Sequence, residues 1–298
     1  MPEQLALTHP APATAAPLSG PVLVFDSGVG GLTVLAEIRA ARPDAPLLFV
    51  ADDAVFPYGA LDSAALVARV VGLLGPIIEA ERPSLVVIAC NSASTVVLPP
   101  LRARFAVPFV GTVPAVKPAA AATRTGLVSV LATPGTVARD YTRALIRDYA
   151  PQCTVTLVGS ARLAGLAEAR MRGEAVADAD IAREIAPCFV ERDGRRTDTV
   201  VLACTHYPWL LDRFERLAPW PVQWIDPAPA IARRVAALLA DAAPHGGTGR
   251  FLFTSGRIPP APLREVLARF GLHEPARMPA EDAAKSLPEL TVRLGGST

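Results

Sequence analysis

The chain has 298 residues, a length that favours about two domains of ordinary size. Hydrophobic residues make up 51% of it and charged residues 19%, which is typical of a globular protein with substantial cores. The formal net charge is only +1 and no long basic run occurs, so nucleic acid is not an expected partner.

The four cysteines are Cys90, Cys153, Cys188 and Cys204, and none of them forms a Cys-x-x-Cys pair. A zinc ribbon or a thioredoxin-type motif is therefore unsupported, and we predict no metal site. The first residues show neither a basic start nor a continuous apolar core, so no secretory signal is recognised. No uninterrupted apolar run approaches the ~20 residues of a membrane helix, so we expect no membrane partner. Free thiols fit a reducing cytoplasm, which is the expected location.

Residues 1–20 are rich in Ala and Pro and predict a mobile or loosely docked extension. From Pro21 onward, apolar runs typical of buried strands alternate with helical patterns. Strands are expected over residues 22–25, 47–50, 85–89 and 108–111, and helices over 32–41, 63–80 and 94–105. Pro99 and Pro100 are expected to disturb the last of these helices.

The alternating pattern restarts at Gly126. Strands are expected over residues 126–131, 154–158, 199–203 and 222–225, and helices over 137–149, 163–172, 178–189 and 229–240. A glycine-rich loop then leads to a strand at 251–253 and a helix at 262–270. We expect this last part to close the first domain.

Strands that alternate with helices predict an α/β fold with parallel sheets covered on both faces, and the repetition predicts two such units. In open parallel sheets, ligands bind at the carboxyl ends of the strands. Asp26, Cys90, Thr133 and Cys204 all lie just past predicted strand ends. They could therefore share one cleft.

A hydrophobic strand that ends in a cysteine occurs twice. Residues 85–94 read LVVIACNSAS, and residues 199–208 read TVVLACTHYP. In both copies the cysteine precedes a helix start, where unpaired N–H groups and the helix dipole favour a thiolate. Cys153 and Cys188 lack this setting and are expected to be ordinary buried side chains.

Two symmetric thiols suit proton transfer on the two faces of one carbon. A thiol, with a reference pKa of about 8.5, can be tuned to act as acid or base near neutrality. Racemisation without a cofactor needs one group to remove the α-proton and another to donate from the opposite side. The α-proton of an amino acid is weakly acidic, so the carbanionic state needs electrostatic stabilisation. The loop Asp26–Gly28 and the side chains of Asn91, Ser92 and Thr205 are plausible suppliers.

Four motifs together resemble those of glutamate racemase. They read FDSGVGGL at 25–32, PYG at 57–59, ACNSAS at 89–94 and CTHYP at 204–208. The resemblance runs from about residue 22 to 238. It implies cofactor-free interconversion of L- and D-glutamate, which supplies D-glutamate for peptidoglycan. Family members often have Thr at the position of Ser92, and the hydroxyl is kept here.

The resemblance also implies the architecture. It predicts two pseudo-symmetric αβα sandwich domains with mainly parallel sheets and the active site in the cleft between them. Residues 113–118 resemble the family's crossing between the domains. We therefore expect a first domain over 21–113 plus 227–298 and a second over 114–226.

The resemblance assigns roles to individual residues. Cys90 and Cys204 would be the proton acceptor and donor. Asp26 would accept a hydrogen bond from Cys90 or from the substrate ammonium, while His206 and Glu168 would support the second thiol. The contacts to glutamate would come from Asp26, Ser27, Pro57, Tyr58, Gly59, Asn91, Ser92, Thr133, Thr136, Thr205 and His206.

Several of these residues also have plainer interpretations. His206 fits a satisfied structural histidine, Glu168 an exposed helical glutamate, and Thr136 the N-cap of a helix. The run Gly28–Gly31 is not a dinucleotide fingerprint, because the third glycine would fall at Thr33.

Other functions stay open. The chain also fits an aspartate or hydantoin racemase of the same superfamily. A decarboxylase would need only one of the two thiols, and a regulatory binding protein would need neither. Some racemases that resemble this chain carry an N-terminal extension and respond to a muramyl-peptide precursor, so we consider such an activator here. The resemblance also leads us to expect a homodimer.

Overall fold

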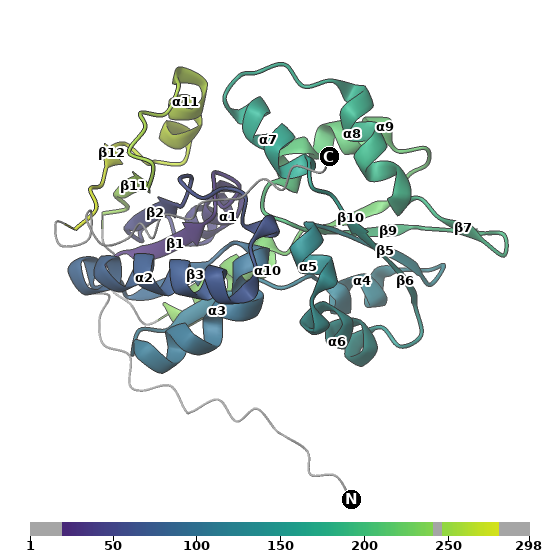
Figure 1. The fold of residues 1–298 in the computed structure, drawn as a ribbon, viewed down its shortest axis with the longest axis horizontal. Coiled ribbons are helices and arrows are strands. Elements are labelled where there is room, and N and C mark those ends of the chain that lie inside the picture. Colours follow the sequence, from purple (N-terminus) through teal and green to yellow (C-terminus); the bar gives the residue numbers. More distant parts are fainter. Residues whose placement is uncertain (1–19, 241–245, 280–298) are drawn as a thin grey trace, which may run out of the picture.

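The computed structural model describes residues 20–240 and 246–279. The expected extension over residues 1–20 lies outside the described residues, apart from Gly20. Two α/β halves lie side by side, and each is built on its own parallel sheet (Figure 1).

The first half contains a six-stranded sheet in the order β12-β11-β2-β1-β3-β4, with every neighbouring pair parallel. The run VLVFD in β1 is fully buried, as expected for a central strand that is covered on both faces. As predicted, the C-terminal strand β11 joins this sheet, beside β2. The strands are β1 (Val22–Asp26), β2 (Leu47–Ala51), β3 (Leu85–Ile88), β4 (Phe109–Gly111), β11 (Gly249–Phe253) and β12 (Glu274–Pro275).

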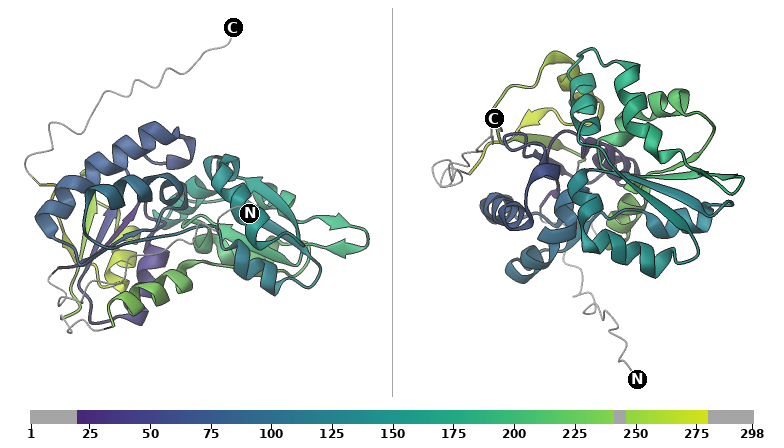
Figure 2. Two further views of the ribbon diagram at one scale, coloured as in Figure 1. Left: turned by 90° about the horizontal axis from the view of Figure 1, so that it is seen from below. Right: turned by 45° about the vertical axis from the view of Figure 1, so that its right-hand side comes forward.

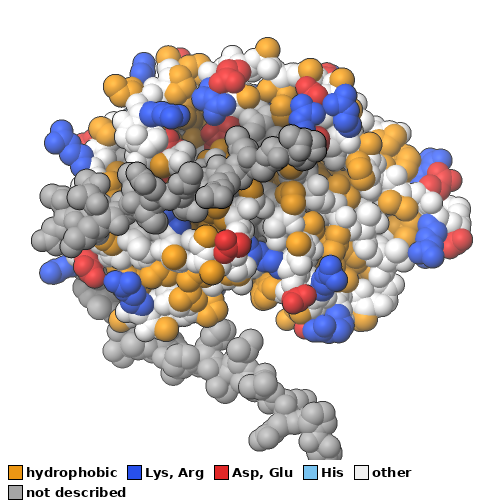
Figure 3. Space-filling view, viewed as in Figure 1, with side chains coloured by type: hydrophobic (Ala, Val, Ile, Leu, Met, Phe, Trp, Pro, Cys, Tyr) orange, Lys and Arg blue, Asp and Glu red, His pale blue; other side chains and the backbone are white. Residues whose placement is uncertain are grey.

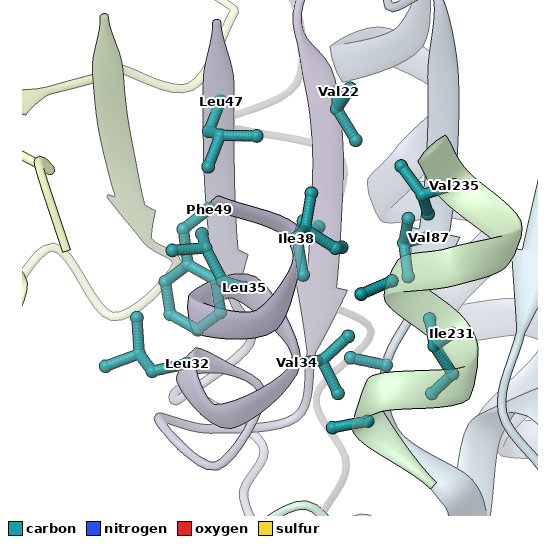
Figure 4. Close-up of a cluster of buried hydrophobic side chains, with 14 of the residues drawn as sticks. Val22, Leu32, Val34, Leu35, Ile38, Leu47, Phe49, Val87, Ile231 and Val235 are labelled. Carbon is teal, nitrogen blue, oxygen red and sulfur yellow. The ribbon is translucent and has the colours of Figure 1, made fainter. Parts of the chain in front are cut away.

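Helices cover both faces of this sheet. One face is packed by α1 (Leu32–Ala41), α10 (Ala228–Leu238) and α11 (Ala261–Arg269). Figure 4 shows part of this core, where α1 and α10 direct aliphatic side chains toward the strands. The other face is packed by α2 (Ser63–Glu81) and α3 (Asn91–Arg104).

Among the described residues, only α2 is long and apolar enough to cross a membrane, judged by length and composition alone. Its side chains Leu66, Val70, Leu74 and Ile77 are buried in the first half's core. These buried positions account for the apolar residues on the side of the helix that faces the core.

The second half contains a four-stranded parallel sheet in the order β10-β9-β5-β6. Its strands are β5 (Leu127–Ala132), β6 (Thr154–Gly159), β9 (Thr199–Ala203) and β10 (Gln223–Ile225). One face packs against α7 (Leu163–Met171), α8 (Asp178–Ile185) and α9 (Leu211–Leu217), and the other against α4 (Val116–Ala122) and α6 (Asp140–Tyr149). Figure 2 shows these layers from two further directions.

Short elements complete the fold. They are α5 (Pro134–Ala138), the 3-10 turns η1 (Tyr58–Ala60), η2 (Ala186–Cys188) and η3 (Tyr207–Leu210), and the hairpin of β7 (Glu191–Arg192) with β8 (Arg195–Arg196). Acidic and basic side chains are interspersed over the face shown in Figure 3. This distribution matches the near-zero net charge.

The predicted α/β fold with two mainly parallel sheets is confirmed. The domain boundaries at residues 113/114 and 226/227 stay a prediction.

Three local expectations differ from the structure. The helix expected at 94–105 begins at Asn91 and continues through Pro99 and Pro100. Pro99 is exposed, so its ring does not disturb the packing of this helix against the core.

The helix expected over residues 137–149 is divided into α5 and α6. Arg139 between them has an extended backbone, and Asp140 then opens α6 with an acidic side chain in its first turn. The helix expected over 178–189 ends at Ile185, where the turn η2 begins with Pro187 in its first positions.

Candidate active site

Two thiols lie at the carboxyl ends of corresponding strands in the two halves. Cys90 follows β3 at the start of α3, and Cys204 follows β9 just before η3. Both residues line one cavity of about 20 Å³. A single water needs about this much space, so glutamate can enter only if the walls separate.

Both halves contribute walls to this cavity. Every predicted glutamate contact except Asp26 and Thr136 lines this cavity. Asp26 is hydrogen-bonded to Thr205 and Thr136 to Ser92, and both of these partners line the cavity. The walls consist of Ser27, Phe56, Pro57, Tyr58, Gly59, Cys90, Asn91 and Ser92 from the first half, and Thr133, Ala164, Cys204, Thr205 and His206 from the second.

Cys90 lies in an acidic, buried setting. Its Sγ is 3.5 Å from Ser27 Oγ. Burial, followed by the negative charge of Asp26, raises the pKa of the Cys90 thiol to about 12. This thiol is therefore protonated at neutral pH.

Asp26 is fully buried, and burial raises the pKa of its carboxyl to about 6 although the charge of His206 opposes the shift. Its carboxylate accepts hydrogen bonds from Thr205 Oγ1 and from the Gly28 N–H, both at 3.2 Å. The expected hydrogen bond from Cys90 is not among the contacts of the described residues, because the Cys90 thiol bonds to Ser27 instead. Asp26 thus acts on Cys90 through its charge.

Cys204 lies beside a histidine that is itself paired. Its Sγ is 3.8 Å from His206 Nδ1, and His206 Nε2 is 3.0 Å from Glu168 Oε1. Burial lowers the pKa of His206, but hydrogen bonds with Cys204 and Glu168 outweigh it and raise the pKa well above its ordinary value. The imidazolium can then donate to the sulfur on one side and to the carboxylate on the other.

Glu168 is buried, with 7% of its surface exposed, so its interpretation as an exposed helical glutamate is wrong. Burial raises the pKa of Glu168, but the hydrogen bond from His206 and that from the Val29 N–H, at 2.8 Å, bring it below its usual value. A carboxylate at this place keeps His206 charged and oriented.

The glycines after Asp26 allow the two halves to approach closely. A Cβ atom on Gly28 would lie 2.3 Å from Glu168 Oε1, and one on Gly30 would lie 2.4 Å from His206 Nδ1. A larger residue at either position would force the loop or the His206–Glu168 pair to shift. The glycine run therefore serves the contact between the halves.

Three hydroxyls meet at the other end of the cavity. Ser92 Oγ lies 2.9 Å from Thr133 Oγ1 and 3.3 Å from Thr136 Oγ1, and the two threonine oxygens are 3.1 Å apart. Thr133 is the N-cap of α5 and accepts from the Thr136 N–H, so the expected N-cap at Thr136 is wrong by three residues. Each hydroxyl can donate to a carboxylate.

The wall residue Asn91 carries an unpaired polar atom. Asn91 Oδ1 is buried and has no hydrogen-bond partner among the described residues. An amide oxygen in this state can accept a hydrogen bond from an ammonium group.

None of the described residues that form the wall is an arginine or lysine, so an anionic ligand would depend on hydroxyl and N–H donors. No group of three or more His, Cys, Asp or Glu residues suited to a metal ion occurs in the described ranges. A larger cavity of about 470 Å³ lies between the N-terminal parts of α2 and α3 and the α5–α6 junction, but none of the described residues that line it carries a thiol. Chemistry, and not volume, identifies the candidate site.

Residues 33–235 match the model of a family described as Asp/Glu/Hydantoin racemase. The chain belongs to this racemase family. A glutamate racemase from Brucella anthropi is 57% identical over 258 residues, which cover 85% of this chain and 92% of the relative. The predicted resemblance to glutamate racemase is thereby confirmed, and so is the prediction of an amino-acid racemase.

Solved structures of the family share the fold. The glutamate racemase of Escherichia coli, solved with L-glutamate and the activator UDP-MurNAc-Ala, is 40% identical with a TM-score of 0.79; the match covers 86% of this chain and 97% of that one. The enzyme of Thermus thermophilus, solved with β-chloro-D-alanine, is 28% identical with a TM-score of 0.68, and the match covers 89% and 99%.

Two wall residues of this racemase-family site escaped the sequence analysis. The ring of Phe56 lies 5.3 Å from the ring of His206 and is tilted by 48° to it, and its position just before Pro57 was the available signal. Ala164 lies in α7, one turn before Glu168. A small apolar residue in a helix gives no signal in the sequence that it borders a cavity.

Proposed function

We propose that this chain interconverts L- and D-glutamate, without a cofactor, by proton transfer between Cys90, Cys204 and the substrate Cα. The observation that supports this most directly is that both thiols line one cavity. A thiolate on one face removes the α-proton, and the electron pair of the broken C–H bond remains on the carbanionic substrate. The thiol on the other face then donates its proton to the same carbon, which inverts the configuration.

The substrate's own charges complete the site. The ammonium group fits the buried acceptors Asn91 Oδ1 and Asp26. A cation placed there would lower the pKa of the Cys90 thiol from about 12, since an opposite charge favours the thiolate. The thiol base is therefore activated by the substrate that it deprotonates.

The three hydroxyls of Ser92, Thr133 and Thr136 fit the distal carboxylate of glutamate. They belong to α3 of the first half and to the β5–α5 junction of the second, so one carboxylate can bridge the halves. Closure around the substrate would exclude water and strengthen these hydrogen bonds.

Purified protein incubated separately with L-glutamate, L-aspartate and a hydantoin tests the proposal. We expect optical rotation to disappear with glutamate and to change much more slowly with the other two. Faster loss with aspartate or the hydantoin would assign the chain to that branch of the family instead. No loss with any substrate would favour the non-catalytic binding protein.

We further propose that the product serves peptidoglycan synthesis in the cytoplasm and that a UDP-MurNAc-peptide precursor activates the enzyme. The support is the E. coli relative, which was solved with such an activator. Rates measured with and without UDP-MurNAc-Ala test the proposed activation. The same comparison after deletion of residues 1–20 tests whether the extension takes part in it.

A homodimer is also proposed, and the molar mass in solution tests it.

A further inference from the structure

Asp52 lies at the end of β2, directly behind the cavity wall, and has no assigned part in the site. Its side chain is fully buried, and its backbone N–H donates to the Asp26 carbonyl at 2.9 Å. An unpaired carboxylate in such a place would be very unfavourable. The groups that bond to the Asp52 carboxylate therefore determine the role of this residue.

Four donors surround the Asp52 carboxylate. Arg69 donates through Nε at 2.8 Å and through Nη2 at 2.6 Å, and Thr254 Oγ1 donates at 2.6 Å. The fourth donor is the hydroxyl of Tyr58. Four hydrogen bonds fill the lone-pair positions of a carboxylate. Asp52 thus joins α2, the residue that follows β11 and the turn η1 at one point.

Tyr58 uses its only O–H for this contact. Burial and then the charge of Asp52 keep the pKa of Tyr58 well above its ordinary value, so the hydroxyl stays protonated and continues to donate. It cannot donate the same proton to a substrate. Tyr58 contributes its ring and backbone to the cavity, and its hydroxyl anchors the loop.

The anchored loop forms a continuous piece of the wall. Residues 56–59 all line the cavity. Its last member, Gly59, touches the second half: a Cβ atom there would lie 2.8 Å from Thr133 Cβ, and one on Gly135 would lie 2.8 Å from the Gly59 carbonyl oxygen. A small shift of the loop would therefore change how closely the halves meet.

We propose that Asp52 is a positioning residue for racemisation: by holding the Tyr58 hydroxyl it fixes the loop 56–59, and with it the contact between Gly59 and Thr133 that closes the cavity around the substrate. The inference rests on the proposed function. It assigns Asp52 to substrate binding through Tyr58, with no direct contact to the reacting atoms.

Tyr58→Phe removes the hydroxyl and keeps the ring. We expect it to raise KM about tenfold or more for both enantiomers, as fits a lost hydrogen bond to a charged group, while kcat changes less than threefold. Because L- and D-glutamate are equally stable, kcat/KM must fall by the same factor in both directions. Asp53→Asn is the matched control. Asp53 accepts from the Ser255 N–H at 2.9 Å and more weakly from Thr254 Oγ1 at 3.5 Å, and no hydrogen bond joins it to Tyr58 among the described residues.

The Asp52→Asn substitution and its combination with Tyr58→Phe complete the test. If Asp52 acts through Tyr58, the double variant should have nearly the KM of the Tyr58→Phe single variant. Thr254→Val, which removes one donor, should raise KM about threefold and covers the case in which Asp52→Asn fails to fold. An unchanged KM in Tyr58→Phe, an equal rise in Asp53→Asn, or additive effects would overturn the inference. A wild-type chain that does not racemise glutamate would instead overturn the proposed function.

Discussion

The two cysteine motifs look alike in the sequence but have different neighbours in the structure. Cys90 has a hydroxyl at 3.5 Å and a buried carboxylate near it, and both burial and that charge hold its thiol in the protonated form. Cys204 has a histidine at 3.8 Å whose pKa is raised well above the ordinary value. The wall of one cavity therefore holds a thiol near a buried carboxyl group and a second thiol next to an imidazolium.

This difference shows how two similar strand ends could serve the two proton transfers, removal of the α-proton and return of a proton to the opposite face. A cation stabilises a thiolate, and a buried anion stabilises a thiol. In each direction one sulfur must begin charged and the other must begin protonated. The two sulfurs thus have unlike neighbours, an acidic carboxyl near Cys90 and an imidazole near Cys204, and the substrate ammonium would act mainly on the Cys90 side.

Removing either sulfur should have the largest effect. Cys90→Ala and Cys204→Ala should each lower kcat by at least about a thousandfold, since each removes one of two proton-transfer groups. Polarimetry with both enantiomers measures this, and circular dichroism of the fold serves as the control. Full turnover in either variant would contradict a two-thiol reaction.

Loss of the imidazolium should affect one face more than the other. His206→Asn should lower kcat about a hundredfold, because Cys204 loses its hydrogen-bonding cation. Glu168→Gln should have a smaller effect in the same direction, about tenfold, since the amide keeps the position but not the charge. Primary isotope effects measured from each enantiomer should become more unequal in both variants. Equal isotope effects in both directions would argue that the asymmetry is irrelevant to rate.

Asp26 gives a prediction for pH. Its folded pKa of about 6 lies above the ordinary value of 3.8, so its ionisation destabilises the fold. The stability present below pH 3.8 is lost as the pH rises through about 6, a loss of up to about 3 kcal/mol. Asp26→Asn should therefore gain stability relative to wild type at pH 8 and not at pH 3.5.

The same substitution should change activity in the other direction. In the wild type, kcat/KM should fall as the pH drops below about 6, because the carboxylate that is proposed to bind the substrate ammonium becomes neutral. Asp26→Asn should be slower throughout and should lack this step. Denaturant unfolding measures the predicted change in stability, and pH–rate profiles measure the predicted change in activity. Parallel pH–rate profiles of the wild type and Asp26→Asn would contradict the assignment of this step to Asp26.

The two remaining cysteines should show the smallest effect. Cys153 and Cys188 do not line the cavity, and Cys188 is buried against the second half's core. Cys153→Ser should change kcat/KM by less than twofold. A large loss of activity in this variant would mean that a thiol other than those of Cys90 and Cys204 takes part in the reaction.

The fold followed from the sequence where local pattern and tertiary packing agree. The buried runs VLVF and LVVI predicted central parallel strands because they are apolar on both faces. Helix limits were less certain, because a single extended residue such as Arg139 divides one apolar pattern into two helices. The hairpin β7–β8 is too short and too exposed to leave a hydrophobic signal.

The candidate site followed from motifs, but its pairings did not. The sequence placed Glu168 and His206 far apart along the chain, and only folding shows their 3.0 Å contact. Asp52 is harder to recognise, since it resembles its neighbour Asp53 until the buried contacts with Tyr58 and Arg69 are known. Ala164 carries no polar group at all. Side chains that act through packing or through another residue leave little trace in a single sequence.

Solvent deuterium incorporation tests the central claim most directly. In heavy water, the first D-glutamate formed from L-glutamate should carry deuterium at Cα while the remaining L-glutamate keeps its proton, and the reverse should hold from D-glutamate. This result follows if separate sulfurs remove and return the proton. Product that retains the substrate proton, or early exchange into the unreacted enantiomer, would show that one group does both.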